Sequence, residues 1–449
     1  MKKHLLLFGL MAVLFASCEK KEESYDCKAV NTCVYEIMDT YYLWNREMPQ
    51  QRKLNFDDEP DVFFDKLLYS ADHWSFIDDD SESTNAQLEG SPYSMGYSPQ
   101  FHLYDGGEHV LILVEFVYPG SPADLAGLKR GDIILDINGT PLTPKNYYDL
   151  YQEKKATYTC ATYDASTNTL NETGKLTMEA TVVKADPSIY DTIFYVGNKP
   201  VGYYVFTAFA SDKSYLATMD NVFDKFKDAG VKDLILDLRY NGGGDIGVAS
   251  HLASAIAPAN VVKNHNVLVT YVYNDLLTSY FEEDEDEILV RFPDNDYNAD
   301  IENLYVLCTE GTASASELVA IGLEPYMNVK LIGTNTYGKY TGMFIFDKDV
   351  RGCKDLENWI LLPVCMKYAN SEGFSDFVDG LEPDYKVEDD LLSGYQFGDA
   401  NDPMLATALD VIGGLPLTAK AARVKPFESL GRDRSIVGNN LIIRPSSLR

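Results

Sequence analysis

Strands and helices alternate along residues 186–390, and this pattern constrains the fold more than any other feature of the chain. An apolar segment at 201–206 precedes a segment at 216–226 whose apolar residues recur at helical spacing. Further apolar segments follow at 233–238 and 305–308. Because strands that alternate with helices pair mainly in parallel, the sequence predicts an α/β fold with a mainly parallel sheet covered by helices.

The stretch 310–339 contains a possible activated nucleophile. We expect a strand end, a turn of small residues, a helix, a second strand at 329–333 and then a Gly-Lys loop. Ser314 stands where the turn becomes the helix, so backbone N–H groups and the helix dipole surround its hydroxyl. The amine of Lys339 can take the hydroxyl proton if burial lowers the pKa of the amine. The two residues predict a Ser-Lys version of an activated nucleophile.

A run of three glycines, 242–244, follows the predicted strand at 233–238. Its spacing matches neither GxxxxGK[ST] nor GxGxxG, which argues against a phosphate site. Glycine lets the backbone approach a reacting carbonyl closely, so the run can supply oxyanion-hole N–H groups. A plain strand-to-helix turn is the alternative, and a serine at a second helix start favours the oxyanion hole.

Residues 91–185 have a different pattern, with short apolar runs separated by turns. The run PGSPADLAGLKRGDIILDING resembles a PDZ domain of the bacterial protease type. Such domains bind extended C-terminal peptides by adding a strand to the edge of a sheet. The resemblance implies a carboxylate-binding loop at Gly96 and Tyr97, and a helix with Tyr147 and Tyr151 along the peptide groove. The alternative is that these helix tyrosines pack in the domain core, and the sequence favours neither role over the other.

Three further motifs occur in order: DLRYNGGG at 237–244, GTASASE at 311–317 and YGK at 337–339. Together with the PDZ-like run they resemble peptidase family S41, the C-terminal processing (tail-specific) peptidases. GLEPD at 380–384 is similar to the closing motif of that family. The resemblance covers about residues 90–390 and implies a ClpP/crotonase-like catalytic core.

The family resemblance assigns roles to individual residues. It implies that Ser314 is the nucleophile and that Lys339 is the general base. It also implies an oxyanion hole made of two backbone amides, one from Gly243 or its neighbour Gly244 and one from Ala315. No cofactor is implied.

The family resemblance does not assign a third catalytic residue as directly as it assigns Ser314 and Lys339. Some members of the family place a Gln four residues after the lysine, where this chain has Met343. Others use an Asp on the helix after the nucleophile, and Glu324 is the carboxylate near that place; a helix-end surface carboxylate is its alternative role. Glu317 is expected to serve the helix start. Ser316 competes for the role of nucleophile, but it lies further into the helix.

The first 17 residues predict an exported lipoprotein. Two lysines precede an apolar stretch at 5–15 that is too short to span a membrane. Residues 14–17 and Cys18 resemble a bacterial lipobox, which implies lipidation of Cys18 and attachment to a membrane through that lipid only. An ordinary secretory signal is the alternative. The expected location, similar to that of Bacteroidetes lipoproteins, is the periplasmic side or the surface of the outer membrane.

Composition excludes several classes of partner. A net charge of −31 argues against binding to nucleic acid. The histidines show no HExxH spacing and no CxxC pair exists, so we predict no metal. Export permits disulfides, and Cys27 with Cys33 or Cys353 with Cys365 are close enough in sequence to pair.

The expected organisation follows from these segments. It comprises a signal peptide at 1–17, a tether and helical region at 18–90, a PDZ domain at 91–185, a catalytic domain at 186–390, and a C-terminal helix with a basic tail at 391–449. The predicted function is an exported serine endopeptidase that cleaves proteins with apolar C-termini recognised by the PDZ domain. The alternative is a non-catalytic peptide-binding lipoprotein on the same scaffold, which the presence of Ser314 and Lys339 disfavours. An esterase is disfavoured because no GxSxG elbow is present.

Overall fold

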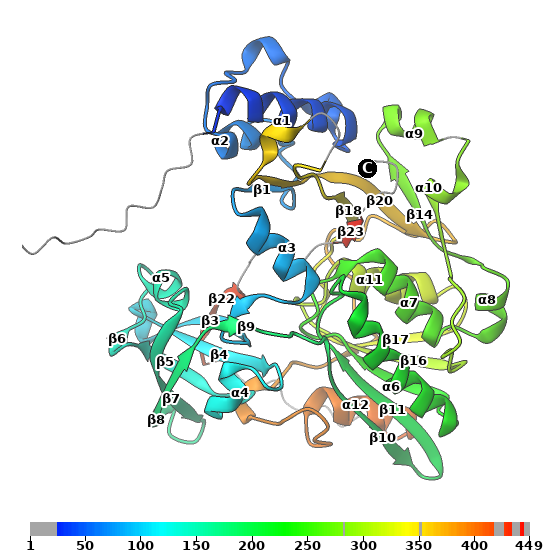
Figure 1. Cartoon of the computed structure of the whole chain (residues 1–449). Helices are drawn as coiled ribbons and strands as arrows, with labels where there is room; N and C mark the ends of the chain where they lie inside the picture. The colour runs from blue at the N-terminus through cyan, green and yellow to red at the C-terminus, as the bar shows by residue number, and fades with distance from the viewer. Residues whose placement is uncertain (1–24, 282, 350–352, 417–425, 433–440, 444–449) are drawn as a thin grey trace, which may run out of the picture.

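The structure, a computed structural model, describes residues 25–281, 283–349, 353–416, 426–432 and 441–443 (Figure 1). The expected signal peptide and Cys18 lie outside the described residues. Within the described part of the chain, no helix combines the length and apolar character that a membrane span requires.

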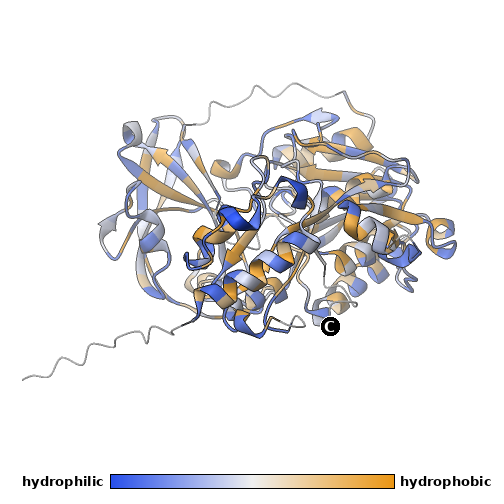
Figure 2. Ribbon diagram, turned by 90° about the horizontal axis from the view of Figure 1, so that it is seen from above, coloured by the Kyte–Doolittle hydropathy of each residue, from blue (hydrophilic) through white to orange (hydrophobic). Residues whose placement is uncertain are grey.

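A six-stranded sheet forms the centre of residues 186–390, the expected catalytic domain, which we call the catalytic region. Its strand order is β10 (Ser188–Val196), β11 (Lys199–Phe206), β12 (Asp233–Asp237), β16 (Asn303–Cys308), β17 (Asn328–Gly333) and β21 (Tyr385–Lys386). All neighbours pair in parallel except β10 with β11. The inner strands β11, β12 and β16 are largely buried, because both faces of the sheet are covered there, and many strands of the molecule are apolar in Figure 2. The prediction of a mainly parallel sheet is confirmed.

Helices cover this sheet on both faces (Figure 1). The helices α6 (Leu216–Asp228), α7 (Ile246–Ile256) and α11 (Ala315–Leu323) share a core with residues of one sheet face, such as Leu234 and Val306. The helix α12 (Pro403–Ile412) packs against residues of the other face, such as Ile235. Asp402 caps α12 and accepts from the Met404 N–H, and Pro403 is the first residue of the helix.

A second six-stranded sheet, which the sequence analysis did not anticipate, packs against α11. Its order is β13 (Gly244–Asp245), β23 (Leu441–Ile443), β18 (Thr341–Phe344), β20 (Val364–Asn370), β14 (Val267–Tyr273) and β15 (Leu289–Arg291). Every residue of α11 is buried, because the helix contacts α7 on one side and β14 and β20 on another. The short helices α9 (Asp275–Phe281) and α10 (Glu285–Ile288) contact β14 of this sheet, and α8 (Ala259–Lys263) precedes β14 in the chain.

The N-terminal region is helical, as expected, but it is also built into the catalytic region. Its helices are α1 (Cys27–Tyr41), α2 (Pro60–Asp65) and α3 (Ser81–Glu89). Its strand β1 (Phe76–Asp78) pairs antiparallel with β19 (Ile360–Leu362), a strand of the catalytic region. Apolar residues of α1 therefore share one continuous core with the catalytic sheets.

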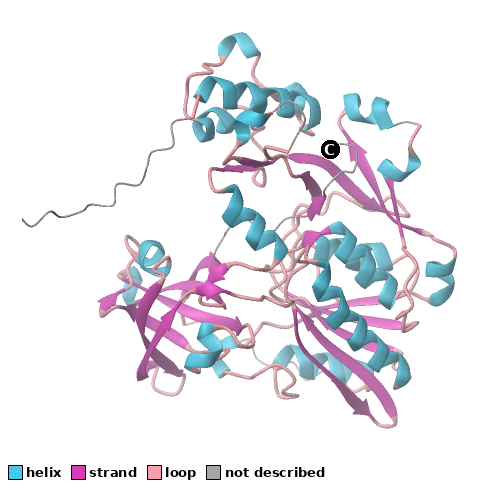
Figure 3. Cartoon of the chain, in the orientation of Figure 1, coloured by secondary structure: helices cyan, strands magenta, loops and turns pink. Residues whose placement is uncertain are grey.

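The PDZ segment, residues 91–185, is mostly β-structure (Figure 3). Its sheet has the order β22 (Glu428–Arg432), β3 (Tyr97–Tyr104), β4 (His109–Val117), β5 (Ile133–Ile137), β7 (Lys155–Asp164) and β8 (Thr169–Glu179), with β6 (Thr140–Pro141) on β5. The helices are α4 (Pro122–Ala126) and α5 (Tyr147–Tyr151). Ser121 caps α4 and Gly127 ends it in the left-handed conformation. The strands β2 (Tyr93–Ser94) and β9 (Thr181–Val182) pair at the two ends of the segment.

The six described cysteines are free thiols, so neither disulfide suggested by sequence proximity is formed. Cys33 of α1 has Cys353 as its thiol neighbour: burial and a hydrogen bond with Cys353 raise the pKa of Cys33. Cys365 donates to the Pro363 carbonyl oxygen at 3.3 Å. Sequence proximity failed here because the fold brings α1 against the segment that contains Cys353.

Candidate active site

Ser314 is the N-cap of α11 and follows the turn after β16. Its backbone has φ 59° and ψ −111°, a conformation that non-glycine residues rarely adopt. The side chain is fully buried, and within the described residues its Oγ has no hydrogen-bond partner. Strained backbone and an unpaired buried hydroxyl both carry a free-energy cost, and such features cluster at functional sites.

Ser316, the competing serine, has a different environment. Its hydroxyl donates to the Asn241 carbonyl oxygen at 2.9 Å, and it is fully buried as the second residue of α11. This hydroxyl is therefore occupied by a structural bond to the glycine turn. The geometry favours Ser314 as the reactive hydroxyl.

Lys339 lies in the loop between β17 and β18 and is fully buried. Burial lowers the pKa of its amine to about 7, and the negative charges of Asp72 and Glu317 oppose that shift only in part. Its Nζ lies 3.5 Å from Met343 Sδ, the residue at the place where some family members have Gln. A substantial fraction of the amine is consequently neutral near pH 7, as a general base requires.

Glu317 joins the serine turn to the lysine loop. Its buried carboxylate accepts from the N–H groups of Ser314 at 2.7 Å, Gly338 at 2.7 Å and Lys339 at 3.0 Å. It also accepts from the Thr336 hydroxyl at 2.5 Å. Burial raises the pKa of Glu317 to about 6, although these four hydrogen bonds pull it down. The expected helix-start role is present, and the link to the lysine loop is an addition that the local sequence does not reveal.

Tyr368 of β20 provides a second link between the same two segments. Its hydroxyl lies 3.0 Å from the Ser314 carbonyl oxygen and 2.7 Å from that of Lys339. Glu317 thus holds the backbone N–H groups of both residues, and Tyr368 contacts both carbonyl groups. Sequence analysis missed Tyr368 because no motif marks a strand residue of the second sheet.

Asp72 brings the N-terminal region to the site. It is buried, and it accepts from the Tyr42 hydroxyl at 2.7 Å and from the N–H groups of Trp74 and Ser75 at 3.0 Å. Its charge acts on Lys339, where it favours the protonated amine. The sequence signal that points to Asp72 is weak, because it is only a carboxylate immediately before an aromatic loop.

The two predicted oxyanion donors differ in availability. The Gly243 N–H donates to Asn241 Oδ1 at 2.9 Å, so this amide is already bonded in the structure. A Cβ at Gly244 would lie 2.3 Å from the Phe209 carbonyl oxygen, which explains the glycine at that position. Ala315 is the first residue of α11, and an N–H at that position has no acceptor within its own helix.

Glu324, the possible third catalytic member, lies at the opposite end of α11 from Ser314. It is the exposed C-cap of the helix, so the structure does not bring it together with Ser314 and Lys339. Its geometry fits the alternative role of a surface carboxylate. Glu317 and Asp72 are the carboxylates whose charges act on Lys339.

A cavity of about 820 Å³ lies between the PDZ segment and the glycine turn. It is lined by Gly96, Tyr97 and Tyr151 from the PDZ segment, by 242–245 from the turn, and by 429–432 from the C-terminal tail. The predicted carboxylate-binding loop therefore opens toward the predicted oxyanion turn. A peptide bound in this cavity would contact both regions.

The predicted groove helix is packed partly inward. Tyr147 and Tyr151 both contact the buried ring of Phe101, with centroid distances of 4.9 and 5.5 Å. Tyr147 thus fits the core-packing alternative, whereas Tyr151 packs and also lines the cavity. The Gly96 N–H donates to Ser94 Oγ at 3.2 Å, so this amide is engaged within its own loop.

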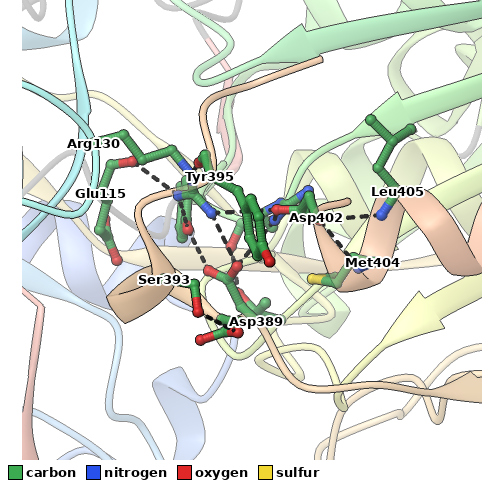
Figure 4. A network of polar contacts seen from close by, with 12 residues as sticks. Glu115, Arg130, Asp389, Ser393, Tyr395, Asp402, Met404 and Leu405 are labelled. Atoms are coloured by element: carbon green, nitrogen blue, oxygen red, sulfur yellow. Dashed lines mark hydrogen bonds and ion pairs between the residues drawn. The ribbon is translucent and has the colours of Figure 1, made fainter. Parts of the chain in front are cut away.

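Arg130 connects the PDZ segment to the catalytic region (Figure 4). It lies in the loop between α4 and β5 and is almost fully buried. Its guanidinium donates to the carbonyl oxygens of Glu115 at 3.0 Å and Tyr395 at 2.9 Å, and to Asp389 Oδ1 at 3.0 Å. Neither the PDZ-like run nor the catalytic motifs indicated this contact.

Arg239, from the DLRYNGGG motif, binds the same Asp389 from the other side. Its Nη1 donates to Asp389 Oδ1 and Asp402 Oδ2, each at 2.9 Å. The Tyr240 hydroxyl also donates to Asp389. Burial would raise the pKa of Asp389, but the charges of Arg130 and Arg239 outweigh burial and lower it to about 2. We call the five residues Arg130, Arg239, Tyr240, Asp389 and Asp402 the arginine junction.

One described group of side chains has the arrangement of potential metal ligands. Ligand atoms of Asp105, Glu108 and His109 lie within 4.8 Å of one another on a turn of the PDZ segment. Both carboxylates are exposed, and exposed acidic groups of this kind are common without an ion. No metal role follows from this group.

Comparisons with known proteins agree with this geometry. Residues 200–387 match Peptidase family S41, residues 29–76 match the Peptidase S41 N-terminal domain, and residues 113–157 match a PDZ domain. The structure is similar to the crystal structure of a putative S41 protease from Bacteroides fragilis, with TM-score 0.70 and 29% identity over 85% of this chain and 97% of that chain.

Curated relatives are more distant. The chain is 27% identical to the carboxy-terminal processing protease CtpA of Bacillus subtilis, over 62% of this chain and 53% of the relative. It is 24% identical to the chloroplastic C-terminal processing peptidase of Tetradesmus obliquus, over 64% of this chain and 59% of the relative. The chain thus spans little more than half the length of these relatives. Two S41 matches, a PDZ match and a structural likeness over most of the chain lead to one conclusion: this chain contains a peptidase family S41 domain, the S41 N-terminal domain and a PDZ domain.

Proposed function

We propose that the protein is a serine endopeptidase in which Ser314 is the nucleophile and Lys339 the general base. The observation that carries the proposal is the shared buried site: Glu317 holds the backbone of both residues, and Tyr368 contacts both. The Ser314 hydroxyl lacks a partner among the described residues, and the Lys339 pKa lies near 7. A hydroxyl without a competing bond and a partly neutral amine are the two reactants of a Ser-Lys dyad.

The proposed mechanism uses these groups in two steps. The Ser314 hydroxyl attacks the scissile carbonyl while neutral Lys339 takes the proton and then gives it to the leaving amine. The Ala315 N–H stabilises the oxyanion, together with Gly243 once its bond to Asn241 is released, or with Gly244. Each such donor contributes about 3 kcal/mol to lowering the barrier. Water then attacks the acyl group, with Lys339 again accepting a proton.

The substrates in this proposal are proteins whose C-terminal tails bind the PDZ domain. Two observations support it: the cavity connects the loop at Gly96 and Tyr97 with the glycine turn, and the relatives are C-terminal processing peptidases. Aromatic side chains along α5 favour apolar tail residues. The glycine turn is the place where the chain of the substrate would be cut.

The experiment compares the wild type with Ser314→Ala, Lys339→Ala and the matched control Ser316→Ala. The substrate is an unfolded protein with an apolar C-terminus, and the measurement is the initial cleavage rate. We expect Ser314→Ala and Lys339→Ala to lose activity and Ser316→Ala to retain a folded chain with measurable cleavage. Undiminished cleavage by Ser314→Ala would refute the mechanism. Binding without cleavage by the wild type would support the alternative, a non-catalytic peptide-binding protein.

A second arm tests recognition of the tail. The same substrate with an amidated C-terminus, or with its last apolar residues replaced by Asp, should be cleaved more slowly. Equal rates for free and amidated substrates would remove the PDZ role and leave hydrolysis intact.

For its location, we propose a cell-envelope lipoprotein attached through Cys18, on the periplasmic side or the surface of the outer membrane. The lipobox-like sequence before Cys18 carries this proposal. The test is fractionation of cells that express the wild type or Cys18→Ala. Membrane association that survives Cys18→Ala would contradict the lipid anchor.

A further inference from the structure

The C-terminal tail of the chain lies on the peptide-binding edge of the PDZ domain. Strand β22 pairs antiparallel with β3, with Ser429 opposite His102 and Arg432 opposite Gln100. The tail runs toward the end of β3 that begins at Tyr97, the predicted carboxylate-binding loop. Because PDZ domains bind peptides by adding a strand to this kind of edge, the tail has the position of a ligand.

Arg432 is the most specific contact of this segment. Its Nε and Nη2 donate to Oε1 and Oε2 of Glu115, each at 2.7 Å, which is a two-point pairing of guanidinium and carboxylate. Its guanidinium also lies over the Tyr240 ring, 5.1 Å from the centroid. A Cβ at Gly311 would lie 1.9 Å from Arg432 Nη1, so the glycine leaves the space that the guanidinium fills.

Glu115 is fully buried on β4, which makes its pairing with a cation important. Its carboxylate accepts from Ser98 Oγ at 2.7 Å, and in the described part of the chain its ion-pair partner is Arg432. A buried carboxylate without a cation is strongly disfavoured. The planar fork of Arg fits the carboxylate and stacks on Tyr240, whereas Lys offers only a point charge.

A second piece of the tail lies at the catalytic region. Strand β23 pairs in parallel with β13 and with β18, with Leu441 between Gly244 and Gly342. Strand β13 is the end of the glycine turn, and β18 begins two residues after Lys339. The tail backbone therefore runs between the predicted oxyanion turn and the strand that follows the predicted base. Both pieces lie along the path proposed for a substrate.

We propose that Glu115, Tyr240 and Gly311 form a recognition site for an arginine side chain of a peptide added to β3, and that the chain's own tail occupies this site. Substrates then compete with the tail for the PDZ edge. This inference rests on the proposed function for the role of the PDZ edge in substrate binding. It adds to that function a chemical class of ligand, namely an extended peptide with an internal arginine. It also adds a competitor for the same site, the C-terminal tail of the chain itself.

Competition within one chain is effective because the tail is tethered. Short flexible tethers give effective concentrations in the millimolar range, so the tail outcompetes a free peptide of similar affinity. The tail should accordingly weaken binding of an added peptide by about tenfold or more.

The first experiment measures binding without cleavage, in chains that carry Ser314→Ala. A fluorescently labelled peptide of residues 426–443 is titrated with the full chain and with a chain that ends at Leu415, and anisotropy reports the bound fraction. We expect the shortened chain to bind about tenfold more tightly or better. A full-length Arg432→Ala chain provides a second comparison without truncation, and it should also bind the peptide more tightly than the full chain. Equal affinities for the full-length and Arg432→Ala chains would refute the resident tail.

The second experiment tests the arginine site itself. With the shortened chain, a peptide with Arg432→Ala should bind at least about tenfold more weakly, and one with Arg432→Lys should be intermediate. Glu115→Gln in the chain should erase the difference between the Arg and Ala peptides, whereas Glu172→Gln, an exposed acid of the same sheet, should preserve it. Equal binding of the Arg and Ala peptides by the shortened chain would refute the site. Since the readout is binding by an inactive variant, a failure of the proposed peptidase activity would leave these results unaffected.

Discussion

This protein has two buried groups of charged residues, and the pKa values in the two groups are shifted by different causes. At the candidate catalytic site, burial dominates: the pKa of Lys339 falls to about 7 and that of Glu317 rises to about 6. In the arginine junction, pairing dominates: Asp389 has its pKa lowered to about 2, and that of Arg239 is raised by the surrounding carboxylates. Lys339, Glu317 and both arginines of the junction are buried, whereas the Asp389 side chain is 13% exposed.

The difference lies in how many opposite charges each group meets. Asp389 contacts two guanidinium groups directly, and Arg239 contacts three carboxylates. Glu317 binds mostly neutral N–H and O–H donors, and Lys339 Nζ lies 3.5 Å from the thioether sulfur of Met343. Direct pairing with several opposite charges fixes the charged forms and joins domains, whereas a shift dominated by burial leaves groups that can exchange protons near neutral pH. Five predictions test this contrast.

The largest expected effect is on activity, from Lys339→Met. Removing the base should lower kcat/KM by ~10³-fold or more, as for loss of other catalytic residues. Stability to urea should be retained or increased, because Met removes the desolvation penalty of a buried amine. Cleavage rates and urea midpoints measure the two effects. A large loss of stability would mean that Lys339 is structural, contrary to the comparison.

In contrast to Lys339→Met, a substitution in the arginine junction should lower the stability of the protein. Asp389→Asn leaves two buried guanidinium groups short of a partner, and we expect a loss of about 3–5 kcal/mol in the free energy of unfolding. The control is Asp379→Asn, at an exposed position. Because the folded-state pKa of Asp389 lies below its ordinary value of 3.8, its stabilisation is complete above pH 3.8 and is lost as the pH falls toward 2. A difference between variant and wild type that did not shrink in acid would contradict this assignment.

The pH dependence of cleavage should report the candidate base. Lys339 acts as a neutral amine, and its pKa is about 7, so kcat/KM should rise with pH through about 7 and level off above it. Below the midpoint, the rate should fall about tenfold per pH unit. A profile that is flat between pH 6 and 8 would exclude this base, provided that the protein stays folded over that range.

A smaller shift is expected from Asp72→Asn. The charge of Asp72 favours protonated Lys339, so its removal should move the midpoint of the pH profile to lower pH, by about a unit or less. Asn keeps an oxygen that can accept from the N–H groups of Trp74 and Ser75. A shift of the pH midpoint to lower pH identifies an electrostatic effect of Asp72 on Lys339. A merely structural role of Asp72 would change the cleavage rate and leave the midpoint in place.

The smallest effect is expected from Glu324→Gln. Glu324 is exposed at the far end of α11, and substitutions at such sites usually change stability by less than about 0.5 kcal/mol. Activity should stay within about twofold of the wild type, measured with the same substrate. A large loss would restore Glu324 as a third catalytic member.

The sequence was informative where function depends on local patterns. Ser314 and Lys339 are marked by a helix start and a Gly-Lys loop, and the structure brings both into one buried cluster. The alternation of strands and helices predicted the parallel sheet.

The sequence was uninformative about contacts between residues that lie far apart in the chain. Tyr368, Asp72 and Arg130 act through contacts with segments far away, and each looks ordinary among its sequence neighbours. The second sheet escaped prediction because β13, β15 and β23 are two or three residues long, too short for a periodic pattern. The ion pair between Glu115 and Arg432 joins residues separated by 317 positions.

The pairing of β1 with β19 has a consequence for how the chain folds. At its end, the Val364 N–H bonds to Ser75 Oγ, across 289 residues. Contacts of such sequence separation slow folding, because the loop-closure entropy is lost before the contact forms. During synthesis, the apolar faces of α1 and α2 are made long before their partners in the catalytic region. We expect the nascent chain to need protection from aggregation until the strand at 360–362 has been made.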